Sequence, residues 1–214
     1  MTSQNRKRVG DRTTEVRTYR REEAVVFFRT KEAFGGLSNM ASGYPLRVGG
    51  VDIHSSEALY QACRFSHLPE VQAEILRQSS AMNAKAVSKD WRHETRPDWV
   101  RIRVNVMRWC LRVKAVQHED TFLGLLMSTG ARPIVELSRR DDFWGALERP
   151  AGVLTGRNVL GRLLMEVRRD RMDGSLCMSE VPPPDIKGLL LLGEPIPLVP
   201  SNAQSPSPSP SRLC

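Results

Sequence analysis

The feature that most constrains this fold is a long amphipathic helix predicted from Pro97 to Lys114. Its apolar residues recur at three- and four-residue spacing, which places them on one helical face; they are Trp99, Ile102, Val106, Cys110 and Val113. The other face is basic and holds Arg101, Arg103, Arg108, Arg112 and Lys114. We therefore predict a folded domain that covers the apolar face and leaves the basic face in solvent.

Shorter predicted elements surround this helix. Ala24–Phe28 is an apolar run typical of a strand, and Gly49-Gly50 separates two apolar pieces, as in a hairpin. Helices are expected near residues 56–65, 69–77, 80–90, 121–128 and 158–169, and a short strand at 134–137. Because most of these elements are helical, we expect a mainly α, compact helical domain with a few short β-strands.

Composition changes near both ends of the chain. Residues 1–21 hold seven Lys or Arg residues against two acidic ones, so they supply much of the net charge of +8. Residues 171–214 include Pro182–Pro184 and an alternating Ser-Pro repeat, which do not build a packed core. We predict a basic disordered leader at residues 1–21, a folded domain at 22–170 and a Pro/Ser-rich disordered tail at 171–214.

Several classes of protein are disfavoured by what the sequence lacks. The four cysteines form no CxxC pair and the four histidines are scattered, so we expect a reducing compartment, no metal site and no cofactor. No apolar run approaches the roughly 20 residues that span a bilayer, and residues 1–21 lack the apolar core of a secretory signal. We expect a cytoplasmic location and no membrane partner.

Three segments concentrate groups that can carry chemistry. They are residues 34–40, with a Gly turn before Ser38 and Asn39; residues 56–65; and residues 136–145, which end in Asp-Phe-Trp-Gly. On the second segment Glu57, Gln61 and Arg64 fall at i, i+4 and i+7, which gives one polar stripe on a helix. The phosphate-binding loops, dinucleotide fingerprints and serine-hydrolase elbows that mark common enzymes are missing. Catalysis here would rely on carboxylates, amides, aromatic rings and amines.

The order and spacing of these segments resemble the NADAR (YbiA-like) family. The similar pieces run from about residue 27 to residue 168 and comprise residues 34–39, 56–65, 82–89, 96–114, 129–130, 142–145 and 156–167. The resemblance implies a compact, mainly helical fold. It also implies N-glycosidase activity on a nucleotide-like substrate, either a riboflavin-pathway ribosylamino-pyrimidine phosphate or ADP-ribosylated guanine of nucleic acid.

The same resemblance suggests site residues. Glu57, Asp142 and Trp144 match functional family positions, and the pocket residues implied are Asn39, Gln61, Arg64, Lys85, Gly145 and Asn158. We assign Asp142 or Glu57 to water activation, with the other orienting the ribose hydroxyls. Trp144 would stack on the base, while Asn39 and Gln61 would read its edge. Lys85 would meet a phosphate or attack a ring-opened sugar aldehyde.

The chain departs from the family pattern at three places. Ala58 replaces a polar or aromatic residue, and Arg64 replaces a lysine, which keeps the charge and changes its geometry. Residues 146–150 replace a Gly-rich stretch, which bears on the substrate more than on the reaction.

Two other functions remain open at this point. In the first, the fold holds ADP-ribose or NAD as a non-catalytic sensor, which the altered stretch at 146–150 favours slightly. The basic leader and the Arg face of the long helix would instead suit a nucleic-acid-binding protein.

Overall fold

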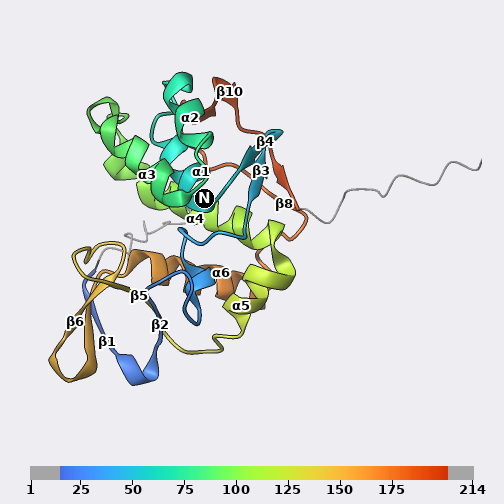
Figure 1. Ribbon diagram of the computed structural model, residues 1–214. Helices are drawn as coiled ribbons and strands as arrows, with labels where there is room; N and C mark the ends of the chain where they lie inside the picture. Colours follow the sequence, from blue (N-terminus) through green and yellow to red (C-terminus); the bar gives the residue numbers. More distant parts are fainter. Residues whose placement is uncertain (1–14, 202–214) are drawn as a thin grey trace, which may run out of the picture.

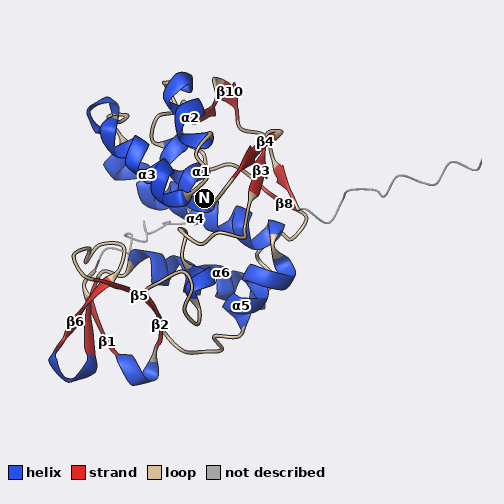
Figure 2. Ribbon diagram, viewed as in Figure 1, coloured by secondary structure: helices blue, strands red, loops and turns tan. Residues whose placement is uncertain are grey.

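The computed structural model describes residues 15–201, and a layer of helices forms one side of this part of the chain (Figures 1 and 2). The layer consists of α1 (Ser56–Cys63), α2 (Pro69–Leu76), α3 (Ala81–Asp90) and α4 (Trp99–Gln117). The side chains of Ser55 and Ser80 accept hydrogen bonds from the backbone of Ala58 and Asn83, which caps α1 and α3. Pro69 begins α2, where its missing N–H costs nothing.

The other side of the molecule is a mixed sheet of five strands, so the prediction of a mainly α fold is wrong (Figure 2). Its order is β1 (Arg17–Arg20), β7 (Val153–Gly156), β6 (Ala146–Arg149), β5 (Ile134–Ser138) and β2 (Val25–Phe27). β2 and β6 run parallel to β5, whereas β7 pairs antiparallel with β6 and β1. The chain therefore has an α/β fold.

Two of these strands, β2 and β5, are the ones predicted at residues 24–28 and 134–137. β1, β6 and β7 were not predicted, because each has only four residues, too few for a period of two to show. β1 lies within the segment predicted to be a disordered leader. Residues 146–150, compared above with a Gly-rich stretch, form β6 and the start of its turn into β7, where Ala151 has a positive φ of 60°. The hairpin predicted at Gly49-Gly50 does form, from β3 (Leu46–Val48) and β4 (Val51–Ile53).

Helix α6 (Val159–Met172) joins the two sides, because it packs on β5 and on α4 (Figure 1). A π-helical turn at Glu119–Leu123 leads from α4 into α5 (Gly124–Met127). Leu160, Leu163, Leu164 and Val167 of α6 join one core with α1 and α4. These apolar residues fix where the sheet lies relative to the helices.

The basic face of α4 was predicted to lie in solvent, but most of it is covered by neighbouring residues. Lys114 is fully buried, and Arg103 is partly buried. Arg108 and Arg112 form ion pairs with Glu166 and Asp170 of α6, at N–O distances of 2.8 and 2.7 Å. α4 therefore has neighbours on both faces, and of its five basic side chains only that of Arg101 is exposed.

Residues 171–201 are ordered, although the sequence predicts disorder there. They form β8 (Glu180–Val181), β9 (Leu190–Leu191), β10 (Glu194–Pro195) and β11 (Val199–Pro200), and Leu191 and Val199 are buried in the main core. Gln72 donates to the backbone oxygen of Leu190 at 2.9 Å and so ties this segment to α2. The boundaries predicted at residues 21 and 170 stay predictions, and residues 1–14 and 202–214 lie outside the described part.

None of the helices within residues 15–201 has the length and apolar character needed to cross a membrane.

The close contact between α6 and β5 gives a test of the fold. A Cβ atom at Gly161 would lie 2.2 Å from the backbone oxygen of Ile134, so Gly161→Ala forces α6 away from β5. We expect it to lower the free energy of unfolding by about 1–3 kcal/mol in denaturant titrations. Gly124→Ala is the matched control, because the nearest atom to its Cβ is 3.8 Å away. Equal stability of the two variants would contradict this packing.

Candidate active site

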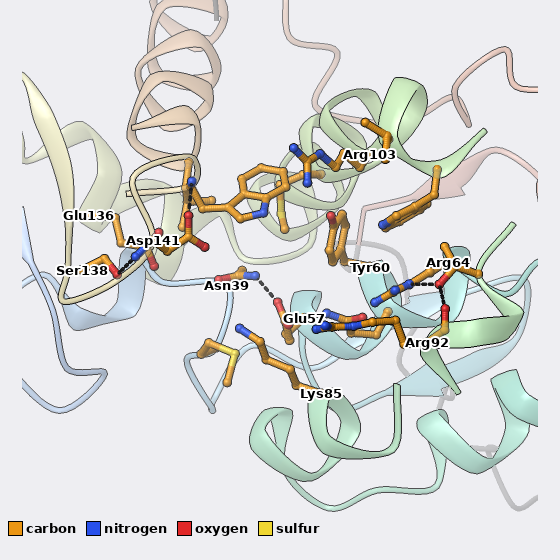
Figure 3. Close-up of a pocket in the computed structure, with 18 of the residues that line it drawn as sticks. Asn39, Glu57, Tyr60, Arg64, Lys85, Arg92, Arg103, Glu136, Ser138 and Asp141 are labelled. Atoms are coloured by element: carbon orange, nitrogen blue, oxygen red, sulfur yellow. Dashed lines mark hydrogen bonds between the residues drawn. The ribbon is translucent and has the colours of Figure 1, made fainter. Parts of the chain in front are cut away.

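A cavity of about 680 Å³ lies between the helical layer and the sheet (Figure 3). That volume suits a nucleotide-sized ligand. Its walls come from the loop after β2, from α1, α3 and α4, and from β5 with the loop that follows. The polar lining residues include Asn39, Glu57, Tyr60, Gln61, Arg64, Lys85, Arg92, Thr95, Arg103, Glu136, Ser138 and Asp141, with Phe28, Trp99 and Trp144 among the aromatic ones.

A buried lysine, Lys114, holds the loop before Asn39 in place through hydrogen bonds. Lys114 Nζ donates to the backbone oxygens of Gly36 and Ser38 at 2.8 and 2.9 Å. It also lies 4.3 and 4.2 Å from the ring centres of Tyr44 and Phe122. Burial lowers the pKa of Lys114, while carbonyl oxygens and ring faces favour its charged form. These contacts fix the backbone that carries Asn39.

Glu57 is the centre of a buried polar network. Asn39 Nδ2 donates to one carboxylate oxygen of Glu57, and Gln61 Nε2 donates to the other at 2.8 Å (Figure 3). Gln61 Oε1 in turn accepts a hydrogen bond from the Ser88 hydroxyl of α3. The amides of Asn39 and Gln61 are thus engaged with Glu57. They position this carboxylate, whereas the sequence predicts that they read the edge of a base.

The electrostatic setting of Glu57 combines burial with nearby donors. Its side chain is only 2% exposed, and burial raises the pKa of the carboxyl. The charge of Lys85 and the hydrogen bond from Gln61 act in the opposite direction. Lys85 itself is exposed on α3 and lines the cavity, so its amine reaches the same space as Glu57.

A second carboxyl group, Glu136, lies in the middle of β5 on the sheet side of the cavity. The pKa of Glu136 is raised to about 7, mainly by burial and then by the charges of Asp141 and Glu57, while the charge of Lys85 acts in the opposite direction. Its backbone N–H donates to Asn158 Oδ1 at 3.0 Å, which fixes the strand. A carboxyl with such a pKa can exchange a proton near neutral pH.

The loop after β5 carries Asp141 and Trp144 into the cavity. Asp141 Oδ1 accepts hydrogen bonds from the backbone N–H groups of Phe143 and Trp144, both at 2.9 Å, so the carboxylate shapes the turn. The Trp144 ring meets Tyr60 of α1 edge-to-face, with centroids 5.7 Å apart. Trp144 therefore has one ring edge supported by the helical layer.

Three predicted site residues do not line this cavity. Asp142 has an exposed side chain, and its neighbour Asp141 takes the place expected for it. Gly145 is required by packing, because a Cβ there would lie 2.6 Å from the backbone oxygen of Glu136. Asn158 is fully buried, and its amide bonds the backbone of Ile134 at 2.8 Å as well as that of Glu136. Gly145 and Asn158 support the site without facing it.

The opposite wall of the cavity is basic (Figure 3). Arg64 at the end of α1 donates from Nε to the Thr95 hydroxyl at 2.7 Å, and this hydroxyl donates to the backbone oxygen of Arg92. Arg103 of α4 lies with its guanidinium 3.8 Å from the centre of the Phe143 ring. Positive groups thus face the carboxylates across the cavity.

Sequence reasoning missed Glu136, Asp141, Arg92 and Arg103 as site residues. A signal existed for Arg103, which is four residues from both Trp99 and Met107, so all three share one helical face toward the cavity. Glu136 also stood out as a charge directly after two apolar residues of a predicted strand. Arg92 and Asp141 lie in turns, where no period indicates which side chains point inward.

In the described part of the chain, no three His, Cys, Asp or Glu side chains are grouped so as to hold a metal ion.

Comparisons with known proteins agree on one family. The model of the NADAR domain matches residues 26–171. The chain is 35% identical over 144 residues to the N-glycosidase YbiA of Escherichia coli, a match that covers 67% of this chain and 86% of that protein. It is 36% identical over 158 residues to a riboflavin biosynthesis protein of Vibrio vulnificus, covering 73% of this chain but 41% of that longer protein.

Among solved structures, the chain is similar to the NMR structure of the E. coli protein YbiA. The two superpose with a TM-score of 0.62 and are 32% identical, and the match covers 72% of this chain and 88% of that one.

The raised pKa of Glu136 makes stability depend on pH. The carboxyl binds its proton more tightly in the folded chain, with a pKa of about 7 against an ordinary 4.5. The stabilisation of the folded chain by this bound proton is therefore fully present below pH 4.5 and is lost as the pH rises through 7. Glu136→Gln should gain about 1–3 kcal/mol over wild type between pH 5 and pH 8 in denaturant titrations. Exposed Glu70→Gln serves as the control, and a gap for Glu136→Gln that stays constant with pH would refute the raised pKa.

Proposed function

The chain belongs to the NADAR family, and on this premise we propose that it is an N-glycosidase, a hydrolase that cleaves the bond between a ribosyl group and a base. The relatives named above include N-glycosidases and a riboflavin biosynthesis protein. One observation supports the proposal most strongly. Glu57 is held by two amide donors in the same cavity as Glu136, whose pKa lies near 7, and as the aromatic ring of Trp144.

N-glycoside hydrolysis makes two demands that this cavity meets. The bond between ribose C1′ and the base nitrogen breaks with its electron pair going to the base, which leaves positive charge on the sugar. A carboxylate next to C1′ stabilises that charge and removes a proton from the attacking water. We assign this part to Glu57, because Asn39 and Gln61 fix both of its oxygens.

The departing base needs a proton, and Glu136 is suited to supply it. A pKa of about 7 keeps a large fraction of this carboxyl protonated at neutral pH. When Glu136 gives its proton to the base nitrogen, the resulting carboxylate recovers one as the water-derived proton is released. Asp141 faces Glu136 and holds the Trp144 turn, so it shapes the base side of the cavity.

Trp144 provides a planar surface for the base. Stacking of a base on an aromatic side chain contributes about 1–3 kcal/mol and tolerates different bases. The Tyr60 and Trp144 rings meet in a T-shaped arrangement, and Trp144 lines the cavity. This arrangement accommodates both a ribosylamino-pyrimidine phosphate and ADP-ribosylated guanine, the two substrate classes that we propose. A cytoplasmic location remains a prediction.

Lys85 offers a second chemical route. Its amine shares the cavity with Glu57 and would attack C1′ of the ring-opened sugar, so that the base leaves with its electron pair and a proton and an imine to Lys85 forms. Water would then hydrolyse this imine and release the sugar aldehyde. Borohydride added during turnover would then trap a covalent adduct on Lys85. If no adduct forms while base is still released, direct attack by water is the route.

Two adjacent aspartates provide a matched test of the site. Asp141→Asn keeps an oxygen that accepts the hydrogen bonds of the Trp144 turn but removes the charge facing Glu136. We expect it to lower kcat for release of free base by about 10²-fold, measured on both proposed substrates. Asp142→Asn changes an exposed side chain outside the cavity and should alter kcat by less than about threefold.

A larger loss of kcat in Asp142→Asn than in Asp141→Asn would instead assign the catalytic role to Asp142. If wild type binds ADP-ribose and releases no base from either substrate, the chain is a sensor rather than a hydrolase.

A further inference from the structure

Three arginines in the cavity wall have no acidic partner. Within residues 15–201, no carboxylate lies within ion-pair distance of Arg64, Arg92 or Arg103. Their neighbours differ in this respect. Arg96 pairs with Asp98 at 2.6 Å, Arg108 pairs with Glu166 at 2.8 Å, and even exposed Arg101 lies 3.8 Å from Asp98. Three positive charges without an ion pair therefore line one cavity.

The arginines are also held close together at an electrostatic cost. Burial and the charge of Arg92 both lower the pKa of Arg64, the direction expected when like charges meet away from water. Thr95 maintains the arrangement, because its hydroxyl accepts from Arg64 Nε and donates to the backbone of Arg92. The terminal N–H groups of Arg64 remain available on the cavity side.

Arg103 completes the cluster from α4. Its guanidinium lies flat enough over the Phe143 ring to approach the ring centre to 3.8 Å. Its Nε is buried and has no hydrogen-bond partner in the described part of the chain. A buried donor without an acceptor is costly unless a ligand supplies one.

We infer that Arg64, Arg92 and Arg103 form a binding site for the phosphoryl group of the substrate, on the helical side of the cavity. Guanidinium groups match phosphate oxygens with paired N–H donors, and three of them offset the charge of a phosphate dianion. The identity of the rest of the ligand, a ribosyl group joined to a base, rests on the proposed function. The phosphate site sets the direction of binding: phosphate at the arginines, C1′ beside Glu57 and base against Trp144. In Figure 3, Arg64 and Arg92 lie on the side of Glu57 away from Glu136.

The direction of binding assigns two tasks to Arg64, contact with Thr95 and contact with the phosphate. An arginine bonds Thr95 through Nε and still presents two terminal nitrogens to a phosphate. A lysine has one nitrogen for both tasks. The departure noted in the sequence thus falls in the phosphate site, whereas residues 146–150 do not line the main cavity.

Calorimetry on the full chain with ribose 5-phosphate and with ribose tests this site without turnover. We expect wild type to bind ribose 5-phosphate at least about tenfold more tightly than ribose. Arg92→Met should reduce that affinity by about tenfold to a hundredfold, and Arg64→Met should do the same. Arg101→Met removes an exposed arginine of α4 outside the cavity and should leave the affinity unchanged. Because Arg92 is exposed in a short turn, its variant is expected to fold normally.

Equal affinity for ribose and ribose 5-phosphate, or equal losses in Arg101→Met and Arg92→Met, would overturn the phosphate site. A parallel titration with ADP-ribose separates a phosphate monoester from a diphosphate as the preferred ligand. If phosphate-dependent binding is present but no base is released from any substrate, the proposed hydrolysis fails and the phosphate site stands. If base is released at the wild-type rate and KM by Arg92→Met, the hydrolysis stands and the phosphate site fails.

Discussion

The buried carboxyl group of Glu57 is the interaction around which the site is organised. Transfer of a carboxylate from water into a protein interior is costly unless hydrogen bonds replace the lost hydration. Here the amides of Asn39 and Gln61 supply one donor to each oxygen. Their own positions depend on further contacts, because Ser88 donates to Gln61 and Lys114 holds the loop before Asn39. A chain of polar contacts thus links α4 and α3 to one carboxylate of α1.

The two-sided architecture explains why groups of opposite charge meet in one cavity. The sheet side contributes Glu136 and Asp141, and the helical side contributes Lys85, Arg64, Arg92 and Arg103. Helix α6 packs on both sides and fixes their separation, and Asn158 at its start forms hydrogen bonds with the backbone of β5. A substrate that carries a base at one end and a phosphate at the other is complementary to this distribution of charge.

Helical periodicity in the sequence predicted part of this structure. The spacing of Trp99, Ile102 and Val106 predicted α4, and the i, i+4 spacing of Glu57 and Gln61 predicted that they share a face. Periodicity does not show whether a polar stripe faces solvent or a cavity. This is why Lys114 was placed in solvent, although it is fully buried. Short strands carry even less periodic signal, and β1, β6 and β7 of the five-stranded sheet were missed for that reason.

Residues in turns were the hardest to assign. The sequence contains Asp141 and Asp142 side by side, and only backbone geometry determines which carboxylate points into the cavity. Family resemblance suggested Asp142, Gly145 and Asn158, whereas the structure shows the latter two in packing and strand support. Charge pairing was a more useful guide, because the arginines without acidic partners were recognisable once the ion pairs of their neighbours were known.

The proposed hydrolysis depends most directly on Glu57 as the group that stabilises the sugar cation and activates water. The decisive measurement is single-turnover release of free base by Glu57→Gln, with affinity for ribose 5-phosphate measured on the same preparation. We expect release to slow by about 10²-fold or more while the affinity for ribose 5-phosphate is retained. Release at the wild-type rate by a folded Glu57→Gln variant would contradict the central claim.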